Sequence, residues 1–353
     1  MNKPSSLHAA DLPRPSGKQR LVNLLVSALP WMIIAGLLYA GLFIKPQAVG
    51  ASVTPPALER RDRVYGLAQG EGGTLLAAAS NGKILAVGAD RKIARQATPV
   101  DLSLQDIAAF DATHAVAVGN DNVILTTEDG GRHWIKADKV PRSQVANKLN
   151  RVRAGANGVA VAVGEMGALL RTQDYGKTWE RLREEEDVAW NDVAILDGGA
   201  FVVVGEFGKI LRSADGGKSW EMVQMREQAP VEGSLMAVAF RDASNGVAVG
   251  LDGVVLTSSD GGRKWSSVKL PAHEHLLDVL WNAHKSEWFA VGVLGRWISG
   301  TQGADGVQWK TGVLGEHTLS WHTRALASGS AYWLAGADVG TWDGQKWAPF
   351  TPN

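Results

Sequence analysis

The feature that most restricts the fold of this chain is a repeat of about 41 residues that begins near residue 64. Each copy opens with a short apolar stretch, such as LQDIAAF at 104–110, and later reaches an apolar run that closes on Val-Gly. A third apolar run follows after a tight turn, and then a polar turn leads into a fourth. This pattern predicts four short strands per repeat, with apolar runs suited to burial on both faces of a sheet.

The number of repeats predicts the architecture. Five copies are clear, and two weaker ones occupy residues 64–99 and 322–350. Seven four-stranded units of this length indicate an all-β protein, a seven-bladed β-propeller. Because a single blade cannot bury its faces alone, we expect residues 64–353 to fold as one domain.

A polar motif, Ser/Thr-x-Asp-x-Gly-x-x-Trp, recurs between the third and fourth strands of four blades. Its glycines permit the positive φ of a tight turn, its carboxylate can accept backbone N–H bonds, and its indole can cover a junction between blades. One carboxylate per turn cannot provide the roughly six to eight oxygen ligands of calcium, so we predict a structural role. The defining residues are Asp129 and Trp134, Asp174 and Trp179, Asp215 and Trp220, and Asp260 and Trp265, with shorter copies at Asp305–Trp309 and Asp343–Trp347.

The N-terminal part of the chain carries an uncharged segment of 23 residues, 21–43. A bilayer span needs about 20 residues, so we predict a cytoplasmic tail (1–20), one N-terminal transmembrane helix (21–43), a linker (44–63) and the propeller (64–353). Basic residues before the segment favour a cytoplasmic N-terminus, which places the propeller of a single-pass inner-membrane protein in the periplasm. A signal peptide cleaved after VGA at 49–51 is the alternative.

Composition excludes several classes of function. Lys plus Arg and Asp plus Glu both number 36, which gives no reason to expect nucleic acid as a partner, and the absence of cysteine excludes thiol chemistry. We expect no cofactor, no metal and no small-molecule substrate. His273, His275 and Asp278 in HEHLLD are conceivable metal ligands, yet such a loop is usually solvated, and the same holds for the basic cluster Lys148, Arg151 and Arg153.

The repeated polar motif is similar to the Asp-box, which sialidases share with several non-catalytic propellers. VGEFGKILRSADGGKSW, together with strand starts such as WNDVAI, more closely resembles the photosystem II stability/assembly-factor family, over about residues 64–350. This resemblance implies a non-enzymatic, exported propeller that helps membrane protein complexes assemble. Bacterial relatives are often membrane-anchored, and some are encoded beside RND-type transporters, so an integral membrane protein of that type is one candidate partner.

A sialidase-like glycosidase or an exported carbohydrate-binding propeller is the alternative function. Sialidases use a tyrosine nucleophile with a glutamate partner and three arginines that bind the substrate carboxylate. Only four tyrosines occur in the chain, and neither Tyr65 nor Tyr332 is expected to be an exposed nucleophile. We therefore expect the protein not to be an enzyme.

The order of the turns predicts where a partner binds. Turns between strands one and two and between strands three and four lie on one face, which carries the Asp-boxes. The opposite face should carry the turns between strands two and three and the connections between blades, and we expect the partner there. The candidate contacts are Asp106, Arg151, Asp192, Asp278 and Arg324 at the start of strand one, Met166, Phe207, Leu251 and Leu294 in the turns, and Trp190 and Trp321 at the blade entrances.

Overall fold

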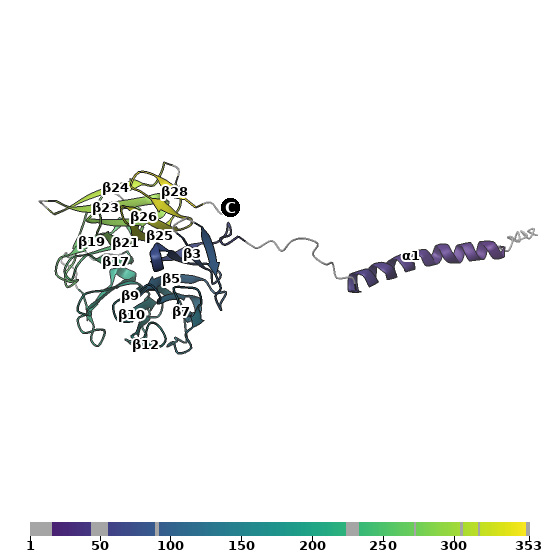
Figure 1. The fold of residues 1–353 in the computed structure, drawn as a ribbon, viewed down its shortest axis with the longest axis horizontal. Coiled ribbons are helices and arrows are strands. Elements are labelled where there is room, and N and C mark those ends of the chain that lie inside the picture. Colours follow the sequence, from purple (N-terminus) through teal and green to yellow (C-terminus); the bar gives the residue numbers. More distant parts are fainter. Residues whose placement is uncertain are drawn as a thin grey trace, which may run out of the picture. The chain divides into compact units, whose positions relative to one another are not determined.

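The computed structural model describes residues 16–43, 56–88, 92–223, 233–271, 273–303, 306–316 and 318–350. The chain divides into two compact units, Met1–Pro55 and Pro56–Asn353. In the first unit, the helix α1 (Gly17–Phe43) contains Pro30 and is long and apolar enough to cross a membrane (Figure 1). The predicted N-terminal apolar helix is therefore confirmed, and it begins four residues before the expected segment.

The second unit contains seven antiparallel sheets, each built from four consecutive strands. This confirms the seven-bladed propeller. Blades 1 to 3 consist of β1 (Val64–Gln69), β2 (Leu75–Ala79), β3 (Ile84–Val87) and β4 (Ile93–Gln96); β5 (Leu104–Ala109), β6 (Ala115–Gly119), β7 (Ile124–Thr127) and β8 (Ile135–Lys136); and β9 (Leu149–Ala154), β10 (Ala160–Gly164), β11 (Leu169–Thr172) and β12 (Glu180–Arg181).

Blades 4 to 7 repeat this plan with one longer hairpin in blade 6. They consist of β13 (Trp190–Ile195), β14 (Phe201–Gly205), β15 (Ile210–Ser213) and β16 (Glu221–Met222); β17 (Leu235–Phe240), β18 (Gly246–Gly250), β19 (Val255–Ser258) and β20 (Ser266–Ser267); β21 (Leu276–Asn282), β22 (Glu287–Gly292), β23 (Arg296–Gly303) and β24 (Gly306–Val313); and β25 (His322–Ser328), β26 (Ala331–Gly336), β27 (Val339–Trp342) and β28 (Trp347–Pro349).

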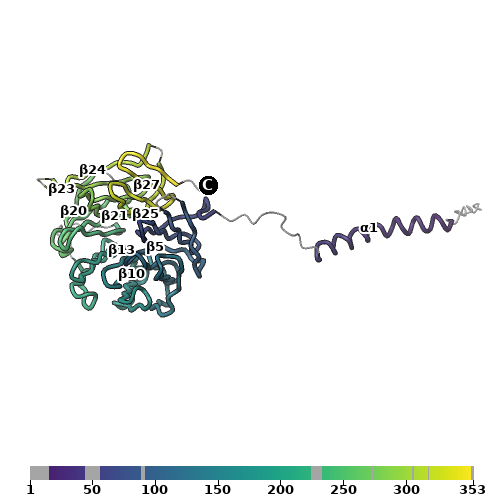
Figure 2. Tube along the Cα trace, viewed as in Figure 1, coloured from purple at the N-terminus to yellow at the C-terminus, as the bar shows by residue number. Residues whose placement is uncertain are grey.

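The hydrophobic core lies between blades. Seven clusters of buried residues each combine side chains of two adjacent blades. Trp134 of blade 2, for example, packs with Leu76 of blade 1. The trace in Figure 2 passes round the ring from blue through teal and green to yellow, which brings the last blade beside the first. Val64 of blade 1 and Val339 of blade 7 belong to the cluster that closes this junction.

Each Asp-box closes its own turn. The Thr127 hydroxyl donates to Asp129 (2.9 Å) and accepts from the Gly131 N–H (3.0 Å), and the Trp134 indole N–H donates to the Gly131 carbonyl (3.0 Å). The same three bonds recur in the boxes of blades 3, 4 and 5. Asp343 accepts two backbone N–H bonds in its shorter turn, whereas Asp305 lies outside the described residues. The polar atoms of the motif are thus occupied within the turn.

The residues just before blade 1 pack on the ring, although they were expected to be linker. Leu58 is buried in the cluster between blades 7 and 1. Asp62 and Glu59 accept hydrogen bonds from Lys83 Nζ at 2.5 and 3.0 Å. Burial by itself lowers the pKa of Lys83, but these bonds outweigh it and the pKa is raised. The propeller unit therefore includes residues 56–63, and the rest of the predicted linker, 44–55, lies outside the described residues.

Candidate partner-binding face

The centre of the ring is lined by the third residue of strand one in each blade. In chain order these residues are Gly66, Asp106, Arg151, Asp192, Ala237, Asp278 and Arg324. The five charged members are between 0% and 6% exposed. Because seven strands converge here, side chains from blades far apart in sequence come within bonding distance. We call this set the channel ring.

Each aspartate of the channel ring joins two neighbouring blades. Asp106 of blade 2 accepts the Val152 N–H of blade 3 at 3.0 Å. Asp192 of blade 4 accepts the Val238 N–H of blade 5 at 3.1 Å. In the same way, Asp278 of blade 6 accepts the Ala325 N–H of blade 7 at 2.8 Å. The carboxylates therefore hold adjacent first strands together at the centre of the ring.

The remaining carboxylate oxygens pair with arginines across the ring. Arg324 Nε donates to Asp106 at 2.9 Å. Arg151 donates to Asp278 at 3.1 Å, and its Nε lies 3.3 Å from Asp192. These candidate contact residues are thus buried and ion-paired in this structure, which gives them a clear role in holding the ring together.

Arg153 completes the network and was missed as a site residue. Its Nε and Nη2 donate to Asp192 at 3.1 and 2.8 Å, and Nη2 lies 3.7 Å from Asp278. The sequence indicated a solvated basic cluster, but Arg151 is buried and Arg153 is half-buried. Two residues apart on one strand, they point to the same side, so strand periodicity was the signal that could have found Arg153.

The arginines determine the ionisation of the channel ring. Burial by itself raises the pKa of Asp192, but the charges of Arg151 and Arg153 outweigh it and lower the pKa below its ordinary value. Burial and repulsion by Arg324 lower the pKa of Arg151 to about 10. Both partners are therefore charged at neutral pH.

Above the channel ring, a pocket of about 340 Å³ opens at the mouth of the channel. The second residue of strand one in every blade lines it: Tyr65, Gln105, Asn150, Asn191, Met236, Leu277 and Thr323. Lys148, Ala189 and Glu165 also contribute to the lining, and Arg151 and Arg324 reach it from the channel ring. The pocket combines amides, both signs of charge and apolar side chains, as suits a polar peptide or protein surface.

The turns between strands two and three lie on the same face as this pocket. Glu165 accepts the Lys148 N–H at 3.3 Å, and Glu206 accepts the Ala189 N–H at 2.8 Å. Both bonds connect such a turn to the entrance of the blade. We call this surface, made of the mouth pocket and these turns, the channel face.

Large apolar side chains project from the channel face on strained backbone. Phe207 and Leu294 have φ of +57° and +55° and are 67% and 50% exposed. Met166 has the same backbone conformation, with φ of +52°, and is half-buried. Leu251 does not share this position, because Asp252 is the residue of blade 5 with positive φ. Leu251 follows Gly250 directly, so alignment of the turns on Val-Gly would have separated it from the other three.

The two tryptophans at blade entrances have different surroundings. Trp190 is completely buried in the cluster between blades 3 and 4, so in this structure its side chain offers no surface to a partner. It occupies the first position of strand one, like the buried Leu104 and Leu149. Trp321 is half-buried and stacks on Tyr65, with ring centroids 6.4 Å apart. Tyr65 lines the mouth pocket, so Trp321 borders the channel face.

The residues considered for glycosidase or metal chemistry are divided between several places: Tyr65 lines the mouth pocket with Glu165 and Arg151, whereas Tyr332 does not line it. The Tyr332 hydroxyl is buried and donates to Glu287 at 2.6 Å, and burial followed by this bond raises its pKa well above the usual value. The His275 ring accepts the Asp252 N–H at 2.9 Å, while Asp278 belongs to the channel ring. Arg151 and Arg324, the two arginines that line the mouth pocket, are paired with aspartates of the protein.

Comparison with known proteins identifies relatives of this architecture. A family model described as photosynthesis system II assembly factor YCF48 matches residues 86–221 and 185–276, which together span more than half of the chain. The search of curated proteins finds no sequence match.

Solved structures share the fold at low sequence identity. A YCF48 bound to a D1 peptide superposes with a TM-score of 0.63 and 18% identity, over 80% of this chain and 91% of its own. YCF48 from Cyanidioschyzon merolae gives 0.62 and 15%, over 82% and 96% of the two chains. PorZ, a surface component of the type-IX secretion system of Porphyromonas gingivalis, gives 0.61 and 14%, over 82% of this chain and 38% of PorZ. These likenesses concern the propeller fold.

Proposed function

Because the chain belongs to the photosynthesis system II assembly factor YCF48 family, we propose that it is a non-enzymatic scaffold that binds a membrane protein and helps its complex assemble. A YCF48 of the same fold has been solved with a bound D1 peptide, which supports a polypeptide as the ligand. Helix α1 would anchor the protein in the inner membrane with its propeller in the periplasm. An RND-type transporter is our candidate for the partner.

The observation that carries this proposal is the pair of exposed apolar side chains at positive φ. A left-handed conformation costs an L-residue about 1–2 kcal/mol, and glycine or asparagine would avoid most of that cost. Phe207 and Leu294 also gain little from burial, since half or more of each side chain is exposed. Residues whose strained backbone lowers the stability of the fold cluster at functional sites, so we assign Phe207 and Leu294 to partner contact.

The mouth pocket supplies the polar part of the same surface. Ala189 lines the pocket and is bonded to Glu206, the neighbour of Phe207 in its turn. Leu277 lines it as well, two residues after His275, whose carbonyl accepts the Val293 N–H beside Leu294. Apolar anchors next to a polar depression are typical of a protein interface with a few dominant contacts.

The test is co-purification from solubilised membranes with the full-length protein. A variant carrying Phe207→Asn and Leu294→Asn should lose the membrane protein that co-purifies with wild type, while its melting temperature stays level or rises, because asparagine tolerates left-handed backbone. Ile135→Asn is the matched control, since Ile135 is 68% exposed on the outer strand of blade 2. Retention of the partner by the double variant would contradict the proposal. Binding or cleavage of glycans with no membrane partner would instead support the glycosidase or carbohydrate-binding alternative.

A further inference from the structure

Blade 6 departs from the plan of its neighbours at its outer edge. In blades 2 to 5 the fourth strand has two residues and follows an Asp-box. In blade 6 the third and fourth strands form one long hairpin, with eight residues in β23 and eight in β24. The pairing of the two strands extends as far as residues 303 and 306.

Because of this hairpin, the third strand of blade 5 lacks, among the described residues, the contact with an Asp-box of the next blade that is made by the third strands of blades 3 and 4. Arg171 in blade 3 and Arg212 in blade 4 each donate to a glycine carbonyl in the Asp-box of the next blade, Gly216 and Gly261 respectively. Thr257 has the same strand position in blade 5, because it pairs with Val247 as Arg212 pairs with Val202. Thr257 instead lines a pocket of about 410 Å³ between blades 5 and 6.

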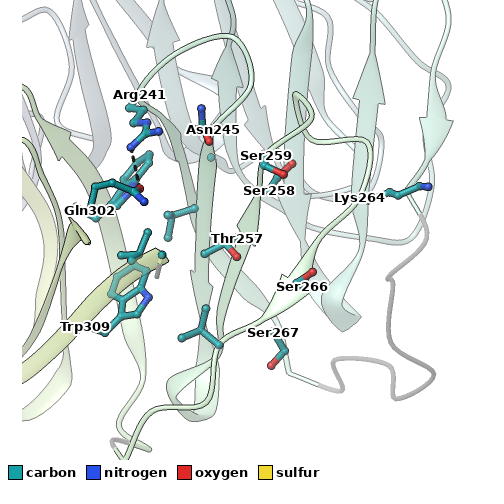
Figure 3. A pocket seen from close by; sticks show the side chains of 16 residues that line it. Arg241, Asn245, Thr257, Ser258, Ser259, Lys264, Ser266, Ser267, Gln302 and Trp309 are labelled. Carbon is teal, nitrogen blue, oxygen red and sulfur yellow. Dashed lines mark hydrogen bonds between the residues drawn. The ribbon is translucent and has the colours of Figure 1, made fainter. Parts of the chain in front are cut away.

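The lining of this pocket, which we call the blade 5–6 pocket, suits an anionic side chain (Figure 3). Trp309 and Gln302 of blade 6 face Thr257 across it, and the hydroxyls of Ser266 and Ser267 lie further along blade 5. Arg241 brings positive charge, whereas the Lys264 side chain points away from Thr257 and Trp309, and the described lining residues include no carboxylate. Arg241 contacts Gln302 (3.5 Å) and pairs with the neighbouring Asp242 (3.1 Å), so part of its charge is already compensated.

Beside the pocket, β24 presents a long outer edge with which no described strand pairs. It is the last strand in the order of its sheet. The Leu314 N–H donates to the Gly295 carbonyl at 2.9 Å, so Leu314 faces β23. Antiparallel strands alternate, and the register continues without a shift, so the backbone N–H and C=O groups of Val307, Trp309, Thr311 and Val313 face away from β23. Such a row of donors and acceptors is a template for another strand.

We propose that an extended, acidic segment of the partner protein pairs with β24 as a fifth strand of blade 6 and places a carboxylate side chain in the blade 5–6 pocket. The backbone edge selects a polypeptide, since only a strand matches the spacing of its groups, and the pocket selects the side chain. The positive charge of Arg241 favours an acidic residue over its amide. This inference rests on the proposed function, in which the partner is a protein.

The probe is a fluorescein-labelled octapeptide of alternating valine and glutamate, titrated with the full-length protein in detergent and followed by fluorescence anisotropy. We expect it to bind at least about fivefold more tightly than the valine–glutamine octapeptide. Thr311→Pro removes an outward N–H and keeps the ladder with β23, so it should weaken binding at least about fivefold. The matched control is Lys136→Pro, on the short outer strand of blade 2, which should leave binding unchanged.

Two further measurements keep the test independent of how Thr311→Pro folds. An octapeptide N-methylated at every residue keeps its side chains but loses its backbone donors, so it should not bind wild type. Amide exchange of Trp309 and Thr311 in wild type should slow when the unmethylated octapeptide is added. Equal binding of the methylated peptide, undiminished binding by Thr311→Pro, or no binding of either octapeptide by wild type would each overturn the inference. None of these results depends on Phe207 or Leu294, so failure here is distinguishable from failure of the proposed function.

Discussion

Removal of one carboxylate from the channel ring should destabilise the whole propeller. Asp192 is completely buried and accepts bonds from the backbones of blades 4 and 5 and from Arg153 of blade 3. Asp192→Ala would therefore disconnect three adjacent blades at the centre of the ring.

The size of the effect follows from what the substitution leaves behind. Arg151 would remain buried with Asp278 as its nearest acid, and the Val238 N–H would lose its acceptor. A broken buried ion pair costs about 3–5 kcal/mol, and a buried unsatisfied N–H about 1–3 kcal/mol. These costs overlap, so we expect a loss of about 4 kcal/mol, which corresponds to a fall in melting temperature of roughly 6 °C for a unit of about 300 residues.

The assay is thermal and urea unfolding of the full-length protein in detergent, followed by tryptophan fluorescence. Asp197→Ala is the matched control, because Asp197 is an exposed acid of the same blade, and it should change stability by no more than about 0.5 kcal/mol. In a double-mutant cycle, Asp192→Ala and Arg153→Met should show a coupling of at least about 1 kcal/mol.

One result would refute this reasoning. A loss below about 1 kcal/mol for Asp192→Ala, with an unchanged urea dependence, would mean that the channel ring is not what holds the blades together. The channel-ring charges would then have to be explained by the mouth pocket and its ligand.

Three shorter predictions concern the turns. In urea unfolding, Gly262→Ala should lower the free energy of unfolding by about 1–2 kcal/mol more than Gly199→Ala. Both glycines have φ near +80°, but only at Gly262 would the new Cβ lie against Val202, at 2.7 Å. Equal losses would refute the packing argument. Phe207→Gly should stabilise the protein by up to about 1 kcal/mol while weakening partner binding, and a clear fall in melting temperature would show that the ring of Phe207 is core. Hydrogen bonds from the Ser219 hydroxyl and backbone lower the pKa of Asp215 in the folded state, so the contribution of this carboxylate to stability is present above about pH 4 and is lost as the pH falls. The difference in melting temperature between wild type and Asp215→Asn should therefore shrink with acidification, and a constant difference would contradict this.

Much of the fold could be predicted from the sequence because its signals are local. The Val-Gly that closes strand two and the glycines of the Asp-box mark each turn, and the apolar runs between them define the strands. Repetition then determines the number of blades and the assignment of turns to faces. The exception is blade 6, where residues 306–309 of the expected short Asp-box copy at Asp305–Trp309 belong to strand β24, which pairs with β23.

The candidate site was less predictable because it depends on contacts between distant residues. Arg324 pairs with Asp106 across 218 positions, and nothing local distinguishes such an arginine from a solvated one. The position of strand one at the centre of the ring was predicted. The burial of its charged residues and their pairing with one another were not predicted. In contrast, Phe207 and Leu294 are at a turn whose geometry is local, so their exposure could be expected from the sequence, while their contact with a partner stays a prediction.

The connectivity of the sheets has a consequence for how the chain can be rearranged. Among the described strands, every blade takes its four from one continuous stretch, and no sheet is completed by a strand from the other end of the chain. The junction between blades 7 and 1 is therefore made by the packing of side chains, as at the other six junctions. The gene could be opened between any two blades and rejoined at residues 56 and 350, and every strand would keep its hydrogen-bonded neighbours. Such circular permutants would attach helix α1, our proposed membrane anchor, to a different blade, which would show whether the proposed partner requires the propeller to approach it from one fixed side.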